Sequence, residues 1–221
     1  MKKLLALLPL IGAFALVGCG DKEGEAKLEY NSDQVRQNVQ RLGNEEGYEV
    51  TCEITASDFE GKQTYTVGAK NNFYWADTGS DKIMYQIVEG GVQLYTYDAD
   101  NGVYEKGYLA PASMAENYES MVDGFGSFLY TAAEYYDTGD FTKVKEVKFL
   151  GRSATQYKLK YEAAAYGKAE YEIIVDKATG ITLKWSGSGT SYEDNRSVSA
   201  TYEVTAFKTG AQVDIPKYND K

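Results

Sequence analysis

The chain has 221 residues, and its 23 basic and 33 acidic side chains give a formal net charge of −10 at pH 7. An acidic chain of this kind repels phosphate backbones, so electrostatic binding of nucleic acid is disfavoured. The sequence contains no histidine. This excludes Ser-His-Asp and Cys-His catalysis, as well as every zinc or haem site that needs a histidine ligand.

The N-terminus has the layout of an export signal. Lys2 and Lys3 form a short positive segment, and the apolar run Leu4–Val17 follows it. This run is shorter than the ~20 residues that a membrane-spanning helix needs, so it fits a cleavable signal better than a permanent anchor. We therefore expect residues 1–18 to be removed from the working protein.

The end of this signal carries a more specific pattern. The tetrapeptide Leu16-Val17-Gly18-Cys19 resembles the lipobox of bacterial lipoproteins. In that family the cysteine thiol receives a diacylglycerol and the signal is cut just before it. The resemblance implies that Cys19 is the lipidated N-terminus, and that its acyl chains attach the protein to the extracytoplasmic side of the cell membrane or outer membrane. The alternative is an ordinary signal in which Cys19 is incidental.

Residues 19–29 are mostly charged or small, as in a tether. The eleven residues that follow the lipidated cysteine span at most about 35 Å when extended, which would keep the remaining domain, residues 30–221, close to the bilayer. After the tether, Asn31 is expected to cap one helix with Gln34, and Gly43 is expected to end it. The apolar residues of this helix recur at helical spacing: Val35, Val39 and Leu42.

The remaining sequence alternates like a sheet. Residues 48–56 place apolar side chains at every second position, which predicts a strand with one buried and one wet face. Turn signals then divide residues 58–108 into five further strands. Helical spacing returns near residues 112–138, and strands resume over 141–207. We expect about eleven strands in total.

The order of helix, antiparallel meander, helical insert and second meander resembles the half-barrel lipid carriers. This superfamily includes LolA-type lipoprotein carriers and the LppX-like lipid-binding lipoproteins of mycobacteria. The closing pattern Asp176, Thr179-Gly180, Phe207 and Pro216 is similar to theirs. The resemblance implies an α+β, mainly β fold. It would be a curved antiparallel half-barrel whose concave face is covered by the N-terminal helix and the insert.

The motifs of common enzymes are missing from the sequence. It contains no Ser-x-x-Lys or Gly-x-Ser-x-Gly motif, and no Gly-x-Gly-x-x-Gly follows a strand. Cys52 lies at an apolar position of its strand and is expected to be a buried structural thiol. Asp98–Gly102 resembles a calcium loop but lacks a closing glutamate, which favours a hairpin turn. We therefore expect no enzyme activity, no metal and no cofactor.

The abundant aromatic residues, 20 of them tyrosine, are the feature left to explain. Most are expected to be ordinary sheet residues. If the curved sheet and its covering helices leave an apolar cavity, inward-facing residues would line it. The same residues would equally form a filled core. The candidates for ligand binding are Val50, Ile54, Tyr65, Val67, Trp75, Met121, Phe125, Phe128, Ile173, Leu183 and Trp185, with Cys52, Met114 and Leu129 beside them.

Three functions remain open from the sequence. The first is a membrane-anchored lipoprotein that binds a hydrophobic molecule, such as a lipid or an acylated protein. The second is a surface interaction module without lipid cargo, such as an adhesin, a carbohydrate-binding protein or an envelope sensor, for which exposed tyrosine and tryptophan are suited. The third is an enzyme, for which no residue set stands out.

Overall fold

The computed structural model describes residues 26–57, 61–115, 117–118, 124, 126–163, 167–190 and 196–220. The predicted export signal, Cys19 and most of the predicted tether therefore lie outside the described residues. Within the described ranges, none of the helices combines the length and the hydrophobicity needed to span a membrane.

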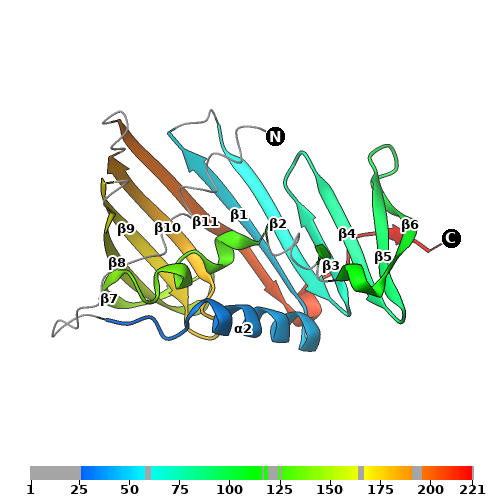
Figure 1. The fold of residues 1–221 in the computed structure, drawn as a ribbon, viewed down its shortest axis with the longest axis horizontal. Helices are drawn as coiled ribbons and strands as arrows, with labels where there is room; N and C mark the ends of the chain where they lie inside the picture. The colour runs from blue at the N-terminus through cyan, green and yellow to red at the C-terminus, as the bar shows by residue number, and fades with distance from the viewer. Residues whose placement is uncertain are drawn as a thin grey trace. The chain divides into compact units, whose positions relative to one another are not determined.

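The described residues form a mainly β, α+β structure, and the expected fold class is confirmed (Figure 1). One α-helix and short 3₁₀ turns accompany a twelve-stranded open sheet, whose strand order is β12-β6-β5-β4-β3-β2-β1-β11-β10-β9-β8-β7. The elements are α2 (Ser32–Glu45), β1 (Tyr48–Ala56), β2 (Gln63–Lys70), β3 (Phe73–Asp77), β4 (Lys82–Val88), β5 (Gly91–Asp98), β6 (Val103–Pro111), β7 (Asp140–Phe149), β8 (Arg152–Ala163), β9 (Gly167–Asp176), β10 (Thr182–Thr190), β11 (Ser197–Thr209) and β12 (Tyr218–Asn219).

The chain divides into two compact units. The first comprises Met1–Asn38, Thr55–Gly61 and Phe128–Glu203, and the second comprises Val39–Ile54, Lys62–Ser127 and Val204–Lys221. We call them unit 1 and unit 2 and describe each by itself.

The start of α2 follows the sequence prediction. The backbone N–H of Gln34 donates to Asn31 Oδ1 at 2.9 Å, and the N–H of Asn31 donates to Gln34 Oε1 at 3.0 Å. This reciprocal pair is a capping box, in which the side chains satisfy backbone groups that the helix leaves unpaired.

The predicted end of α2 is wrong. The helix continues through Gly43 to Glu45, and Gly47 follows it with a φ of 83° and donates its N–H to Leu42 O. Gly43 serves a different purpose, because a Cβ atom there would lie 3.1 Å from the Cβ atom of Ala69 on β2. The glycine therefore allows the helix to approach the strand closely.

The sheet of unit 1 has one apolar and one polar face. Tyr157, Ile173 and Trp185 are opposite one another on β8, β9 and β10, and all three are buried. The other face carries ion pairs such as that of the half-buried Lys184 and Glu203, whose charged atoms lie 2.9 Å apart. This alternation is the pattern expected of an antiparallel sheet with one wet face.

Residues 127–135 cover the apolar face as 3₁₀ turns, η3 (Ser127–Tyr130) and η4 (Ala133–Tyr135), and not as the second helical face that the spacing predicts (Figure 1). The N–H of Ala132 donates to Thr182 Oγ1 at 2.9 Å, and Thr131 Oγ1 donates to Phe128 O at 3.0 Å. In an α-helix, the N–H of Ala132 would donate to Phe128 O. Both groups are instead engaged by these side-chain hydrogen bonds, and the segment therefore forms tighter turns.

The turn between β9 and β10 is built on a buried charge. Asp176 is 1% exposed, and both of its carboxylate oxygens accept hydrogen bonds from Arg152, at 2.8 and 3.0 Å. Asp176 Oδ2 also accepts the N–H and hydroxyl of Thr179. Two backbone carbonyls of this turn also accept hydrogen bonds. Lys177 O accepts the Tyr30 hydroxyl, and Thr179 O accepts the Asn38 amide. The Asp-x-x-Thr-Gly sequence thus fixes the N-terminal segment onto unit 1.

We predict that Asp176→Ala destabilises the protein by roughly 3 kcal/mol. This is the lower end of the range for breaking a buried pair, because Arg152 is 22% exposed and keeps some contact with water. Chemical denaturation measures the loss. The matched control is Asp98→Ala in the exposed turn after β5, which should cause a much smaller change. Equal effects of the two substitutions would contradict this role for Asp176.

Unit 2 differs from unit 1 because β3 to β6 are apolar on both faces. On one face, Tyr85, Val92 and Ala110 form a buried cluster against which Met114 and Tyr118 pack. We call this the helix face, because Ala69 on the same side of the sheet contacts α2. The expected insert helix around residue 114 begins as a 3₁₀ turn, η2 (Ala112–Met114), and the described residues 115, 117 and 118 that follow are α-helical, as predicted.

The opposite face of unit 2, which we call the C-terminal face, carries a second cluster. Its buried members are Phe73, Trp75, Met84, Tyr95, Tyr104 and Val213, with Ile215 and Tyr218 packed against them. The C-terminal segment 213–218 therefore covers this face. Burial raises the pKa of Tyr95 and Tyr104 to about 12, as expected for phenols that are hard to ionise away from water.

Candidate binding site

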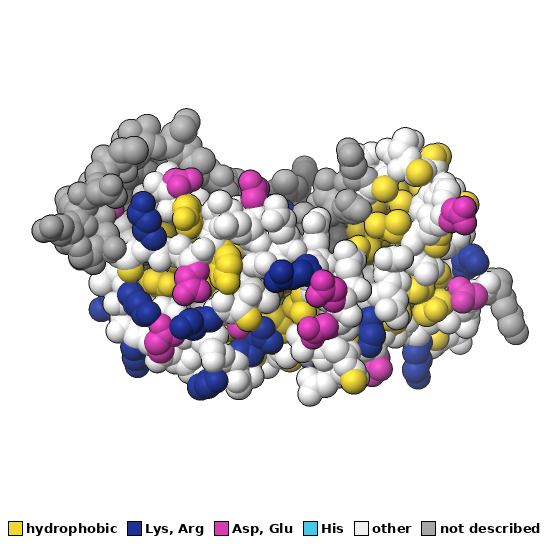
Figure 2. Space-filling view, turned by 90° about the horizontal axis from the view of Figure 1, so that it is seen from below, with side chains coloured by type: hydrophobic (Ala, Val, Ile, Leu, Met, Phe, Trp, Pro, Cys, Tyr) yellow, Lys and Arg dark blue, Asp and Glu magenta, His cyan; other side chains and the backbone are white. Residues whose placement is uncertain are grey.

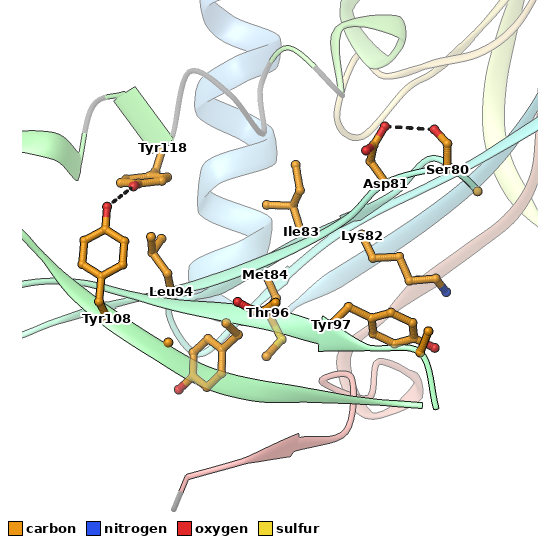
Figure 3. Close-up of a pocket in the computed structure, with 14 residues that line it drawn as sticks. Ser80, Asp81, Lys82, Ile83, Met84, Leu94, Thr96, Tyr97, Tyr108 and Tyr118 are labelled. Atoms are coloured by element: carbon orange, nitrogen blue, oxygen red, sulfur yellow. Dashed lines mark hydrogen bonds between the residues drawn. The ribbon is translucent and has the colours of Figure 1, made fainter. Parts of the chain in front are cut away.

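A hollow lies on unit 2, where the cover over the helix face is incomplete. It has a volume of about 790 Å³ and is bounded by β4, β5, β6 and Tyr118. Ile83 and Leu94 form its apolar floor and are only half-buried. Figure 3 shows their side chains on the same side of the strands as Tyr108 and Tyr118. Hydrophobic side chains also gather around this part of the surface in Figure 2.

Two tyrosines close one end of the hollow. Tyr108 on β6 is 60% exposed, and its hydroxyl lies 3.1 Å from the hydroxyl of Tyr118 (Figure 3). The hydrogen bond between the two hydroxyls raises the pKa of Tyr118. The ring of Tyr118 also lies 6.0 Å from that of Tyr85, which is buried beneath it. The aromatic wall therefore connects to the core while its outer ring stays accessible.

The position of Tyr108 depends on a bulge in β6. The pairing of β5 with β6 shifts register between Gln93 and Tyr95, opposite Gly107. The Gln93 side chain is 7% exposed, and its amide donates to Gly107 O at 2.9 Å and to Leu94 O at 3.0 Å. A bulge leaves ladder groups unpaired and redirects the strand. Gln93 supplies the missing donors, and the bulge places Tyr108 on the hollow side.

The other end of the hollow is polar and rigid. Two hydrogen bonds form within the turn before β4. Gly79 N–H donates to Asp77 Oδ1, and Ser80 Oγ donates to Asp81 Oδ2 (Figure 3). Lys82 lies 2.6 Å from the Asp77 carboxylate, and that hydrogen bond raises the pKa of the lysine. The hollow thus has an apolar floor, an aromatic wall and a polar rim, which is the general composition of small-molecule sites.

The predicted ligand residues on β1 and β2 share the helix face. Val50 pairs with Val67, and Ile54 continues the same alternation. Val50, Tyr65 and Val67 are buried at 0, 8 and 1% exposure, while Ile54 is half-buried. None of these four borders the hollow.

Trp75 was expected on the same face, and this is wrong. It pairs with Gly68 and Met84 and therefore lies on the C-terminal face, opposite Val67. A Cβ atom at Gly68 would lie 2.3 Å from Trp75 Cζ2, so the glycine makes room for the indole. Phe73 to Ala76 are a continuous apolar run, and such a run gives no information on which face is inside.

The predicted residues of unit 1 lie within packed aromatic contacts. The Phe128 ring lies 5.2 Å from that of Tyr202, and the Trp185 ring lies 5.4 Å from that of Tyr135 and 4.2 Å from that of Tyr171. Ile173 and Leu183 are fully buried. Met121 and Phe125 lie outside the described residues. Ligand binding by these predicted residues stays a prediction.

Two other residues singled out in the sequence have structural surroundings. Cys52 is fully buried, and burial raises the pKa of its thiol far above the usual range. The Asp98 carboxylate accepts the N–H groups of Asp100 and Asn101 in the turn after β5. This is the hairpin turn that the sequence favours.

Sequence reasoning missed several of the residues that line the hollow, among them Ile83, Leu94, Thr96, Tyr108 and Tyr118. The strands that carry the first four were predicted, but the bulge at Gly107 was not. The available signals were a glycine inside a strand and a glutamine at an apolar strand position, which together are consistent with a bulge whose carbonyls need donors.

Comparisons with known proteins add little to this geometry. No protein-family model matches the chain, and no curated protein does. Among solved structures, the MucA/MucB complex of Pseudomonas aeruginosa is 14% identical with a TM-score of 0.38, over 83% of this chain and 58% of that chain. The chain thus spans less than two thirds of that protein.

Two further structures match more of their own length. A putative outer membrane lipoprotein-sorting protein domain from Vibrio parahaemolyticus is 10% identical with a TM-score of 0.23, over 83% of this chain and 94% of that chain. A LolA superfamily protein from Nitrosomonas europaea is 8% identical with a TM-score of 0.23, over 85% and 96%. Likeness at this level carries no functional information.

We predict that Gln93→Leu lowers the free energy of unfolding by about 1–3 kcal/mol, because buried carbonyls at the bulge lose their donor. Urea denaturation measures the change. Gln156→Leu, at a half-buried position of β8, is the control for the same substitution on another strand. If both variants lose equal stability, Gln93 has no special role at the bulge.

Proposed function

We propose that this protein is an extracytoplasmic lipoprotein that is anchored through Cys19 and binds a hydrophobic molecule in the hollow of unit 2. The observation that carries the proposal is the half-buried apolar floor formed by Ile83 and Leu94 beside the exposed ring of Tyr108. Apolar surface left open to water is costly, at ~25 cal/mol per Å². A ligand that covers it recovers that free energy.

The size and composition of the hollow support a small amphipathic ligand. Its volume of about 790 Å³ falls within the ~300–1,000 Å³ typical of small-molecule sites. The apolar floor suits an acyl chain, and the rim at Ser80 and Asp81 offers polar groups to a head group. In this proposal the hollow replaces the cavity between sheet and helices that the sequence suggested as the binding place.

The anchor supports the same function. Lipidation at Cys19 would hold the domain within tens of ångströms of a bilayer, since at least two acyl chains bind a membrane durably. A protein that binds acyl chains needs to be located near a membrane, where such chains occur. We also propose that the protein is not an enzyme, because its sequence contains no histidine and none of the common nucleophile motifs.

A surface interaction module is the second candidate function. It is favoured by the exposure of Tyr108 and Leu109, at 60% and 52%, on neighbouring positions of β6. Exposed apolar surface on an edge strand often marks a protein interaction site.

The test is photolabelling of the full chain in its own membrane with a diazirine-bearing fatty acid, followed by peptide mapping. We expect label on β4 to β6. Thr96→Trp should reduce this label at least fivefold, because Thr96 borders the hollow and is exposed, so that an indole fills the space without entering the core.

The control is Thr142→Trp, at an exposed position of β7 in unit 1, which should leave the label on β4 to β6 unchanged. Label spread evenly over the exposed surface, or equal label in both variants, would refute ligand binding in the hollow.

A further inference from the structure

The outer edge of β6 is only partly covered. The short strand β12 pairs in parallel with Tyr104 and Glu105, and in the described part of the chain no strand pairs with Lys106–Pro111 on that side. Residues 106 to 109 are all exposed. Backbone N–H and C=O groups on the open side of such an edge are a template for another strand. Gly107 O is not part of this template, because it already accepts a hydrogen bond from the Gln93 amide.

The side chains on this edge are unusually apolar. Tyr108 and Leu109 are two of the four large hydrophobic residues exposed in the described part of the chain. They point to opposite faces, because Leu109 pairs with Gln93 on the C-terminal face whereas Tyr108 meets Tyr118 on the helix face. An added strand would therefore find an apolar neighbour on each face.

The edge strand of unit 1 shows the opposite design. On β7 the exposed side chains include Lys143, Lys145 and Lys148. Lysines on an edge prevent the addition of further strands. The corresponding stretch of β6 carries only Lys106. The lysines therefore disfavour pairing more strongly along β7 than along β6, although both strands carry a register shift and β7 also exposes Val144.

We propose that residues 106–110 of β6 bind an extended segment of a partner protein by β-strand addition. The segment would carry apolar side chains at alternate positions, so that those on the helix face cover Tyr108 at the rim of the hollow. Strands pair at a spacing of about 4.8 Å, which places such a side chain in contact with the tyrosine ring. Main-chain bonds would supply affinity and the alternate side chains specificity.

Two observations select this partner. First, β12 shows that an extended, non-hairpin segment is accepted on this same edge, with the N–H of Tyr104 donating to Lys217 O at 2.9 Å. Second, the chain carries a formal net charge of −10, so a second copy is repelled and a basic segment is attracted. The partner is therefore a basic, alternating segment and not another copy of this chain.

The experiment measures binding of labelled peptides to the full chain in nanodiscs by fluorescence anisotropy. The probe is the heptapeptide Lys-Val-Lys-Val-Lys-Val-Lys. Its control is Lys-Lys-Lys-Lys-Val-Val-Val, which has the same composition and charge without alternation. We expect the alternating peptide to bind at least tenfold more tightly. N-methylation of its alternate backbone nitrogens should weaken binding at least tenfold.

Variants locate the site on the chain. Leu109→Lys should weaken binding of the alternating peptide at least fivefold, because it adds a blocking charge to the edge. Val144→Lys on β7 should not change the binding of this peptide. Leu109 does not border the hollow, so Leu109→Lys should leave fatty-acid labelling unchanged. This separates the inference from the proposed function.

Equal binding of the alternating, block and N-methylated peptides would overturn the inference, since it would leave only charge attraction. Self-association of the full chain that Leu109→Lys abolishes would also overturn it, because the occupant would then be a second copy.

Discussion

The consecutive apolar residues of β3 impose the constraint on which unit 2 depends. Because side chains alternate between the faces of a strand, Phe73 and Trp75 face one way while Tyr74 and Ala76 face the other. Neither side of this sheet can remain wet. Unit 2 therefore needs two covers. The C-terminal segment provides one, and Met114, Ala115 and Tyr118, from a distant part of the sequence, provide the other.

The hollow follows from the difference between these covers. On the C-terminal face, Val213 and Tyr218 close over Trp75, Met84 and Tyr95, and Lys70 fixes the segment by donating to Val213 O at 2.6 Å. On the helix face, Tyr85 is covered, but Ile83 and Leu94 remain half-buried. Unit 1 has no such asymmetry, because its second face is polar and needs no cover.

Much of the fold could be predicted because it rests on local patterns. The capping box of α2 and the alternation of β1 depend on residues a few positions apart, and the structure confirms both. Gly43 could not be interpreted locally, since its role is the contact with Ala69. The break at Ala132 likewise depends on Thr182, fifty residues further along the chain.

The candidate site was harder to predict for the same reason. In a strand with one wet face, the alternation of apolar and polar residues indicates which side faces inward. Phe73–Ala76 are all apolar and give no such alternation. The sequence therefore assigned Trp75 to the wrong face. The hollow also depends on the hydrogen bond that the Gln93 side chain on β5 donates to Gly107 O on β6. This contact is visible only once the register of the two strands is known. Residue types alone indicated that tyrosines mattered, but not that Tyr108 and Tyr118 would meet.

These features are the basis of the proposal that the domain holds a hydrophobic molecule on an incompletely covered sheet face, and the lipobox resemblance at Cys19 is the basis of the proposed membrane anchor. Native mass spectrometry of the full chain, extracted gently from that membrane, tests this account most directly. It predicts a chain that begins at an acylated Cys19 and carries a non-covalent hydrophobic adduct, which is released on mild activation. A chain with an unmodified Cys19 and no adduct would contradict it.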